Sequence, residues 1–117
     1  MIFCDLYKNR QVLVTGHTGF KGSWLAIWLK ELGAKVIGYA LAPPSEPNNF
    51  TATGLVDKII HVHGDIRDLD SLLDVFNRYQ PEIVFHLAAQ ALVRSSYEDP
   101  KTTFDTNICG TVNVLES

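Results

Sequence analysis

The sequence has few cysteines, no excess of basic residues and no long apolar run, and each shortage excludes a class of protein. Its 117 residues include two cysteines, Cys4 and Cys109, which are too few for a disulfide scaffold and lack metal-ligand spacing. We expect both thiols to be reduced and no metal to be bound. Lys and Arg number 10 against 13 Asp and Glu, so the net charge is -3. That balance argues against a nucleic acid or an anionic membrane as partner.

Nothing in the sequence resembles a membrane anchor. A bilayer span needs about 20 consecutive apolar residues, and no stretch approaches that length. The first ten residues carry Asp5, Lys8 and Arg10 where a secretory signal would be apolar. We therefore expect a cytoplasmic protein. With 46% hydrophobic and 20% charged residues, the composition is that of a globular domain with one modest core.

Short apolar runs alternate with helical patterns along the chain. Helices are predicted over 20–32, from about Asp68 and from Asp99, with Asp68 or a neighbour and Asp99 as N-caps. The proline-rich segment 42–49 is predicted to be a loop. Buried strands are predicted at 11–15, 35–41, 58–64 and 83–87. Such alternation implies parallel strands joined by right-handed crossovers. We predict an α/β fold with a Rossmann-type sheet of about four strands, in the order 3-2-1-4, with flanking helices.

Two helices carry an apolar stripe. In the first helix, which Gly33 would end, the apolar residues recur at spacings of three and four: Trp24, Leu25, Trp28, Leu29 and Leu32. The last helix has a similar stripe made of Phe104, Ile108, Val112 and Leu115. It reaches Ser117 without a stop signal, and the fourth strand would lie at a sheet edge. Both features lead us to expect a truncated domain.

Three glycines stand between the first strand and the first helix. Gly16, Gly19 and Gly22 follow the spacing Gly-x-x-Gly-x-x-Gly. The first allows a sharp turn, the second lets a pyrophosphate approach the backbone, and the third lets the helix pack closely on the strand. Unpaired N–H groups and the helix dipole would then attract phosphate. The context predicts a dinucleotide site, in which Lys21 either contacts phosphate or remains solvated.

The end of the second strand does not distinguish NAD from NADP. It reads Gly38-Tyr39-Ala40-Leu41, with no acidic residue for a ribose hydroxyl and no arginine for a 2′-phosphate. We interpret residues 1–117 as an N-terminal NAD(P)-binding Rossmann domain, truncated, whose C-terminal catalytic and substrate-binding part is absent.

Four runs resemble, in the same order, those of the extended short-chain dehydrogenase/reductase family. They are TGHTGFKGSW at 15–24, GDIRD at 64–68, HLAAQ at 86–90 and TNICGT at 106–111. The first run, GYAL at 38–41 and residues 93–100 are especially similar to the CDP-glucose 4,6-dehydratases of that family. The resemblance covers essentially the whole chain. It implies NAD or NADP as cofactor, with NAD the expected one, and CDP-glucose as the nucleotide-sugar substrate. It also implies a homo-oligomeric parent joined through the helix that begins near Pro100.

The resemblance also implies roles for individual residues. Asp65 would accept a hydrogen bond from the adenine amine and Ile66 would pack on the ring, unless Asp65 is a simple turn residue. Asn107 would brace the active-site backbone, unless it is an ordinary surface amide. Ser96 would lie near the sugar. The expected cofactor-binding residues are Gly16, Thr18, Gly19, Phe20, Lys21, Gly22, Asp65, Ile66, Leu87, Ala88, Ala89, Gln90 and Asn107.

The implied activity is that of an NAD-dependent lyase. C4 of the glucosyl unit is oxidised, water leaves across C5 and C6, and hydride returns to C6, giving a 4-keto-6-deoxy sugar nucleotide for surface polysaccharide. Two alternatives stay open: an epimerase or reductase of the same family, and a non-catalytic dinucleotide-binding fragment. The family's catalytic Tyr-x-x-x-Lys pair is expected beyond Ser117, so no catalytic residue is assigned.

One local match to that pair is rejected, and the histidines are assigned structural roles. Tyr97 and Lys101 have the right spacing, but Pro100 would disrupt a helix spanning both. His61 and His63 share one face of a strand and are expected to pack there, and His86 is also expected to be structural. His17 lies in the phosphate loop, where an approach to the cofactor is possible.

Overall fold

A single parallel sheet organises the molecule, which is described for residues 2–117 by a computed structural model. The strands are β1 (Gln11–Thr15), β2 (Lys35–Ala40), β3 (Ile60–His63) and β4 (Ile83–His86). All the pairings are parallel, and the order is β3-β2-β1-β4. The predicted Rossmann-type fold and strand order are confirmed.

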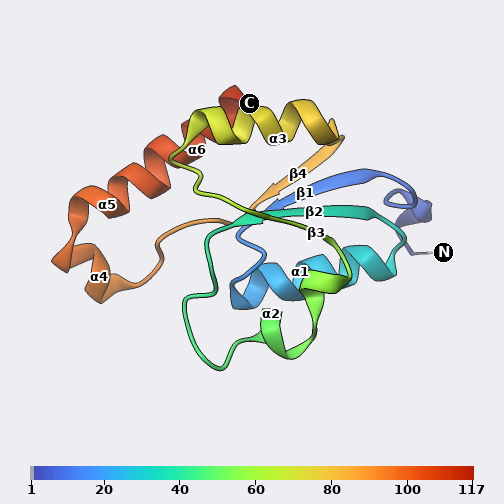
Figure 1. Cartoon of the computed structure of the whole chain (residues 1–117), viewed down its shortest axis with the longest axis horizontal. Helices are drawn as coiled ribbons and strands as arrows, with labels where there is room; N and C mark the ends of the chain where they lie inside the picture. Colours follow the sequence, from blue (N-terminus) through green and yellow to red (C-terminus); the bar gives the residue numbers. More distant parts are fainter. Residues whose placement is uncertain (1) are drawn as a thin grey trace.

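Helices cover both faces of this sheet. Figure 1 shows α1 (Phe20–Glu31) and α2 (Asn49–Ala52) on one face, and α3 (Leu69–Tyr79) and α6 (Gly110–Glu116) on the other. The remaining helices, α4 (Val93–Glu98) and α5 (Pro100–Phe104), extend past the sheet on the side of its carboxyl ends. A π-helical segment, Asp105–Cys109, joins α5 to α6. No helix among residues 2–117 is both long and apolar enough to cross a bilayer.

The core consists of two layers because successive side chains of a strand point to opposite faces. Val12 and Val14 of β1 belong to the α1 layer, and Leu13 between them belongs to the α3 layer. The α1 layer is completed by Ala26, Leu29, Val36, Phe50 and Leu55. The α3 layer is completed by Ile37, Tyr39, Ile66, Leu72, Val75 and Val114. Because β1 is buried on both faces, its carboxyl end is a fixed platform for the loop that follows.

Three helix boundaries follow the predicted signals. The Asp68 carboxylate accepts a hydrogen bond from the Ser71 amide at 3.1 Å, which caps α3. Asp99 does the same for the Thr102 amide at 3.1 Å, with Pro100 as the first residue of α5. Gly33 follows α1 with a φ of 89°, a conformation that favours glycine. Both predicted caps and the glycine stop are confirmed.

The predicted apolar stripe of the first helix does not face the sheet as a unit. Trp24 and Trp28 are each 52% exposed, and α1 instead buries Gly22, Ser23, Ala26 and Leu29. Small residues let the helix axis approach the sheet more closely than tryptophan would. Since α1 is apolar on both sides, the three-and-four spacing alone could not identify the buried side.

The region after β2 and the last helix also differ from expectation. Asn49, assigned to a loop, begins α2, and a 3₁₀ helix follows at Leu55–Asp57. The last helix is interrupted by its π-helical segment, and its apolar stripe is exposed. Val114, which lies beside that stripe, is buried instead.

Candidate nucleotide-binding site

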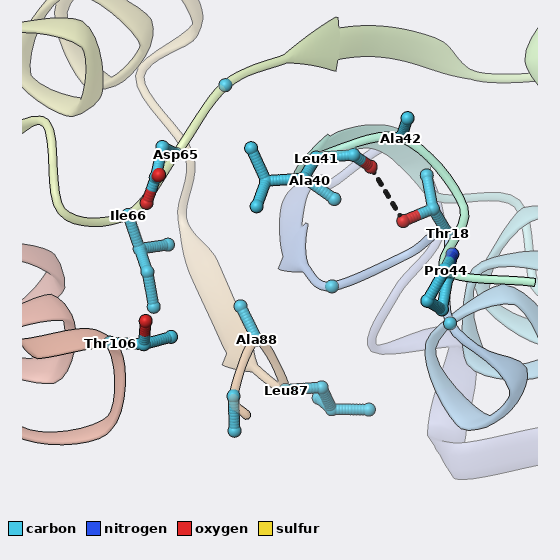
Figure 2. A pocket seen from close by; sticks show the side chains of 14 residues that line it. Thr18, Ala40, Leu41, Ala42, Pro44, Asp65, Ile66, Leu87, Ala88 and Thr106 are labelled. Atoms are coloured by element: carbon cyan, nitrogen blue, oxygen red, sulfur yellow. Dashed lines mark hydrogen bonds between the residues drawn. The ribbon is translucent and has the colours of Figure 1, made fainter. Parts of the chain in front are cut away.

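A groove of about 240 Å³ lies at the carboxyl ends of the strands. Figure 2 shows side chains that converge on it from the turn after β1, from the segments after β2, β3 and β4, and from the final helix. In doubly wound sheets, ligands bind at this end, where the strand order reverses. The volume is below the range of about 300–1,000 Å³ that encloses a drug-sized ligand, so the groove forms one wall of a site. Its lining consists of Gly16, Thr18, Gly19, Ala40, Leu41, Ala42, Pro44, Gly64, Asp65, Ile66, Leu87, Ala88, Ala89 and Thr106.

The three glycines of the loop meet different surroundings. Gly16 has a φ of +81°, and a Cβ there would lie 2.8 Å from the Ala88 nitrogen. A Cβ on Gly22 would lie 2.0 Å from the Gly16 carbonyl oxygen, because α1 crosses the turn at that point. The nearest neighbour of a Cβ on Gly19 is at 3.4 Å, an ordinary contact. Gly16 and Gly22 therefore serve the packing of the backbone. Gly16 and Gly19 both border the groove, and only at Gly19 does the packing leave room for a side chain.

Several amide groups at the start of α1 have no partner in the part of the chain that the structure describes. The Gly19 amide donates to the Gly16 carbonyl at 3.1 Å and the Ser23 amide donates to Gly19 at 2.9 Å. The N–H groups of Thr18, Phe20 and Lys21 make no hydrogen bond to residues 2–117. Unpaired N–H groups beside the positive end of a helix dipole form an anion site.

The loop is fastened to the end of β2. The Gly16 amide donates to the Tyr39 carbonyl at 3.0 Å, and the Thr18 hydroxyl donates to the Leu41 carbonyl at 2.9 Å. The wall that β2 contributes to the groove consists of Ala40, Leu41, Ala42 and Pro44, which carry no charge.

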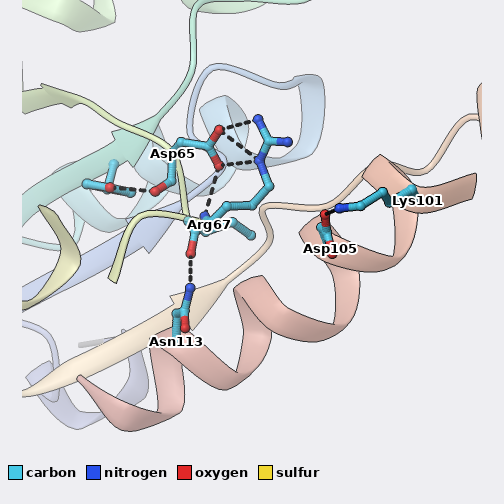
Figure 3. Close-up of polar contacts among 7 residues, drawn as sticks. Asp65, Arg67, Lys101, Asp105 and Asn113 are labelled. Carbon is cyan, nitrogen blue, oxygen red and sulfur yellow. Dashed lines mark hydrogen bonds and ion pairs between the residues drawn. The ribbon is translucent and has the colours of Figure 1, made fainter. Parts of the chain in front are cut away.

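The carboxylate of Asp65 is engaged by its neighbour Arg67 (Figure 3). The guanidinium donates from Nε to both carboxylate oxygens and from Nη2 to Oδ2 at 2.6 Å, and the Arg67 amide adds a bond of 2.9 Å. These bonds lower the pKa of the Asp65 carboxyl below its usual value. An adenine amine would therefore share an acceptor that Arg67 already contacts. Sequence reasoning did not assign Arg67 a role, although the pair Asp-x-Arg after a strand was visible.

The backbone at Asp65 and Ile66 is held by β2 and by α6, both through side chains on the α3 side of the sheet. The Tyr39 hydroxyl donates to the Asp65 carbonyl at 2.8 Å, and Asn113 of α6 donates to the Ile66 carbonyl at 2.9 Å. Ile66 itself is 4% exposed, so its side chain forms the groove floor rather than a free surface.

A hydrogen-bonded chain joins the end of β1 to the last helix. The Thr15 hydroxyl oxygen accepts from the amides of Leu87 at 3.0 Å and Ala88 at 3.1 Å. Its proton is therefore directed to Nδ1 of His86 at 2.7 Å. Nε2 of His86 then donates to the Thr111 hydroxyl at 3.0 Å. Burial lowers the pKa of His86, and the structural role expected for it fits these contacts.

The series of hydrogen bonds that starts at Thr15 ends at a paired contact between Asn107 and Gln90. The Thr111 hydroxyl donates to the Asn107 carbonyl at 2.6 Å. The Asn107 side chain accepts from the Gln90 amide at 2.7 Å and donates to the Gln90 carbonyl at 2.9 Å. The Gln90 side chain turns away to Leu92 and Thr103. Asn107 thus braces the backbone after β4, the geometry that the resemblance implies.

The groove does not bring together every residue expected there. Gly22, Gln90 and Asn107 lie outside the lining, Lys21 is exposed, and Phe20 borders an adjoining cavity of about 350 Å³. Ser96 also lies outside the lining, in α4. Thr106 is a lining residue that the expected set does not contain. Thr106 lies in the π-helical segment, which no residue spacing had predicted.

Tyr97 and Lys101 do not share one helix, as Pro100 led us to expect. Tyr97 is in α4 and Lys101 in α5, with Asp99 between the two helices. Tyr97 is 84% exposed, and the Lys101 ammonium group contacts the Asp105 carboxylate at 2.7 Å.

The suggestion that His17 approaches the cofactor is wrong. Its ring is completely buried behind the loop, with Nε2 at 2.7 Å from Nδ1 of His61. Burial and the nearby His61 lower the pKa of His17 to about 4. Among residues 2–117, no group of three His, Cys, Asp or Glu is arranged to hold a metal ion.

The fold and the groove together define a class of protein. A parallel sheet with reversed order at β1, a glycine turn into α1 and free amides at the turn are the parts of a Rossmann-type dinucleotide-binding domain.

Comparison with known proteins then gives the family. A model of the family described as GDP-mannose 4,6 dehydratase matches residues 13–117, and the chain belongs to that family. It is 51% identical over 117 residues to the CDP-glucose 4,6-dehydratase of Salmonella typhimurium, covering 100% of this chain and 33% of the relative. The CDP-paratose 2-epimerase of Salmonella typhi is 32% identical over 108 residues, 92% of this chain and 32% of the relative.

A solved structure shows the same arrangement. The UDP-glucose 4-epimerase from Brucella ovis in complex with NAD matches with a TM-score of 0.76 and 34% identity, over 92% of this chain and 31% of that one. The chain spans about a third of the length of each of these relatives.

Proposed function

We propose that this chain is the NAD-binding part of a nucleotide-sugar 4,6-dehydratase that converts CDP-glucose to CDP-4-keto-6-deoxyglucose. The observation that carries the proposal is the open start of α1, where the amides of Thr18, Phe20 and Lys21 have no acceptor within residues 2–117. A pyrophosphate is the group that such a turn attracts. Similarity over the full chain to a CDP-glucose 4,6-dehydratase supports the substrate.

In this proposal each wall of the groove has one task. The turn at Gly19 holds the pyrophosphate, Asp65 and Ile66 hold the adenine, and Leu87 to Gln90 pass beneath the nicotinamide half. Ser96 faces the sugar. When bound, NAD would accept a hydride from the substrate and return it. The residues of this chain bind and orient, with Asn107 fixing the backbone at Gln90.

We further propose that NAD is preferred to NADP. The wall formed by Ala40, Leu41, Ala42 and Pro44 offers a 2′-phosphate no cation, and the charged side chain in the lining is Asp65, an acid. A phosphate buried there would lose its water without a partner, so NADP is expected to bind at least about tenfold more weakly.

Titration of the 117-residue chain with NAD tests the cofactor assignment. The melting temperature should rise with NAD, because a ligand that binds the folded state stabilises it. A Cβ at Gly19 would have room to fold but would cover the turn, so Gly19→Ala should keep the fold and lose most NAD affinity. Gly54→Asn is the control: Gly54 has a φ of +64°, which asparagine tolerates, and has no neighbour within 4 Å. A flat response of the unmodified chain would refute the cofactor assignment.

An epimerase is the second candidate. The 32% identical relative and the solved NAD complex are both epimerases. Product analysis of the full-length parent with CDP-glucose separates the two, since a 4-keto-6-deoxy product supports the dehydratase and a C2 or C4 epimer supports the alternative. The 117-residue chain is expected to show no turnover, because it contains no Tyr-x-x-x-Lys pair on one helix.

We also propose that the parent assembles as a homo-oligomer through the last helix. The apolar stripe there is exposed, with Phe104 at 61%, Ile108 at 53%, Val112 at 57% and Leu115 at 81%. Exposed apolar stripes of this kind mark association surfaces. Replacement of Ile108 by Glu should shift the parent toward the monomer in sedimentation, and an unchanged mass would contradict this surface. The cytoplasmic location stays a prediction.

A further inference from the structure

A pair of histidines lies directly behind the phosphate loop. His17 follows the glycine turn, is completely buried, and faces His61 of β3 across 2.7 Å between Nε2 and Nδ1. The edge of the Phe50 ring packs on both imidazoles, with centroids 5.3 Å from His17 and 5.2 Å from His61. A Cβ on Gly38 would lie 2.4 Å from the His17 ring, so the ring fills the place that this glycine leaves vacant.

The position of the hydrogen between the two rings can be assigned. Nδ1 of His17 is buried and has no partner among residues 2–117. A buried N–H without an acceptor costs more than a buried lone pair, because a lost donor leaves a polar hydrogen unsolvated. His17 therefore carries its proton on Nε2 and donates to His61, which keeps Nδ1 free and its own proton on Nε2.

This arrangement exists only when both rings are neutral. A proton added to Nδ1 of His17 would have no acceptor, and a proton added to Nδ1 of His61 would face the Nε2–H of His17. Neither imidazole contacts a carboxylate. The charged or titratable group that acts on His17 is His61, and the one that acts on His61 is His63 of the same strand; α2 contributes the uncharged Phe50 and β2 the uncharged Gly38.

The His17–His61 hydrogen bond is one of three contacts that attach the loop at residues 16–18 to the sheet. Gly16 is tied to the Tyr39 carbonyl and Thr18 to the Leu41 carbonyl, both at the end of β2. His17, between them, extends the attachment to β3. The free amides that would face a pyrophosphate begin at Thr18, next to this anchor.

We infer that the neutral His17–His61 hydrogen bond is a positioning device that holds the phosphate loop in its nucleotide-binding shape. This rests on the proposed function for the identity of the ligand. His17 and His61 are positioning residues, since neither lines the groove. When the pair takes up a proton, the loop loses its central anchor and nucleotide affinity falls.

Two variants at position 61 separate positioning from space filling. His61→Gln keeps an acceptor for His17 and cannot be protonated, whereas His61→Leu removes the acceptor. At pH 8 the Gln variant should bind NAD within about threefold of the unmodified chain, and the Leu variant about tenfold more weakly, as calorimetry would measure. Lowering the pH from 8 toward the His17 pKa of about 4 should weaken NAD binding to the unmodified chain more than to His61→Gln, with the loss growing below about pH 5. His63→Gln, at an exposed position on the same strand, is the matched comparison: it removes only the charge that acts on His61 and keeps the His17–His61 bond, so its NAD affinity at pH 8 should equal that of the unmodified chain.

A second measurement needs no ligand and no variant. In ¹⁵N-histidine spectra of the chain at pH 8, His17 and His61 should both be protonated at Nε2 and free at Nδ1. Protonation of His17 at Nδ1, or equal NAD affinity of the Gln and Leu variants, would overturn the inference. Failure of the unmodified chain to bind NAD, with the expected spectra, would instead overturn the proposed function.

Discussion

The two halves of the sheet differ in what holds their loops. On the β1–β2 side, β1 is buried from Val12 onward and β2 from Val36 onward, and the phosphate loop is fastened there through backbone contacts and a buried ring. On the β4 side, the strand is partly exposed, and Leu92 and Val93 after it are 68% and 71% exposed. Polar contacts from Thr15 and Asn107 hold that segment. The loop after β1 is thus built into the core, whereas the segment after β4 is attached to the core mainly by hydrogen bonds.

The largest loss of stability is expected when a side chain is added at Gly22, on the β1–β2 side. Gly22→Ala places a Cβ 2.0 Å from the Gly16 carbonyl oxygen, and backbone must move to admit it. We expect a loss of more than about 3 kcal/mol in the free energy of unfolding. Gly19→Ala, with its nearest contact at 3.4 Å, should cost about 1 kcal/mol or less. Urea unfolding followed by tryptophan fluorescence measures both, and equal losses would show that the two glycines have the same surroundings.

The second-largest loss of stability on the β1–β2 side should come from lowering the pH. The pKa of His17 falls from 6.5 to about 4 on folding, so the unfolded chain binds a proton more readily between these values. Stability is therefore complete above pH 6.5 and is lost as the pH falls toward 4, by an amount on the order of 3 kcal/mol. The lowered pKa values of His61 and His86 act in the same direction. Asp65 and Asp99, whose pKa values are also lowered, lose their contribution only below about 4.

Urea unfolding at pH 7.5, 6.0 and 5.0 would follow this loss. His63→Gln removes only the smaller cause of the lowered His61 pKa and leaves His17 buried, so most of the pH dependence should persist, which distinguishes the buried pair from general charging of the surface. A flat profile between pH 7.5 and 5 would mean that His17 is not buried as described.

On the β4 side, the hydrogen bonds between Asn107 and the Gln90 backbone should contribute less to stability than the packing around Gly22. Asn107→Ala removes two hydrogen bonds to the Gln90 backbone and should cost about 1–2 kcal/mol. The amide of Gln90 should exchange with solvent faster while amides of β1 keep their protection. Asn113→Ala, which loses one bond to the Ile66 carbonyl, is the matched comparison and should leave Gln90 protected. Slow exchange at Gln90 in the Asn107 variant would contradict the role of the brace.

The smallest change in stability is expected for substitutions in the exposed apolar stripe of the last helix. Val112 is 57% exposed, so Val112→Gln should change the stability of the chain by no more than about 0.5 kcal/mol. Val114, two residues further along the same helix, is 8% exposed, and Val114→Gln should cost about 2 kcal/mol. Thermal melts of the two variants measure the contrast. Similar melting temperatures would indicate that the helix does not pack on α3 in the orientation seen.

The features that could be predicted from the sequence are those with a local cause. Strands such as 11–15 are continuous apolar runs, Asp68 and Asp99 cap the helices that follow them, and Gly33 has a φ that few other residues adopt. The strand order follows from the alternation of strands with helices. The glycine turn is also a local signal, and it predicted that the groove lies at the end of β1.

The features that escaped prediction depend on partners far apart in the chain. The buried side of α1 is chosen by contact with the sheet, which favours Ala26 over Trp24. The His17–His61 contact joins residues 44 positions apart, and no spacing rule connects them. The interruption at Asp105–Cys109 changes which residues of the last helix reach the groove, and its residues carry no proline or other break signal.

The chain of contacts from Thr15 through His86 to Thr111 has a consequence for chemistry at this end of the sheet. Each hydroxyl and each ring nitrogen along it already has a fixed partner and direction. An imidazole in that state has no lone pair to offer a substrate and no proton to release without breaking the link between strand and helix. His86 therefore links β4 to β1 and to the last helix, and it is not free to act as a base.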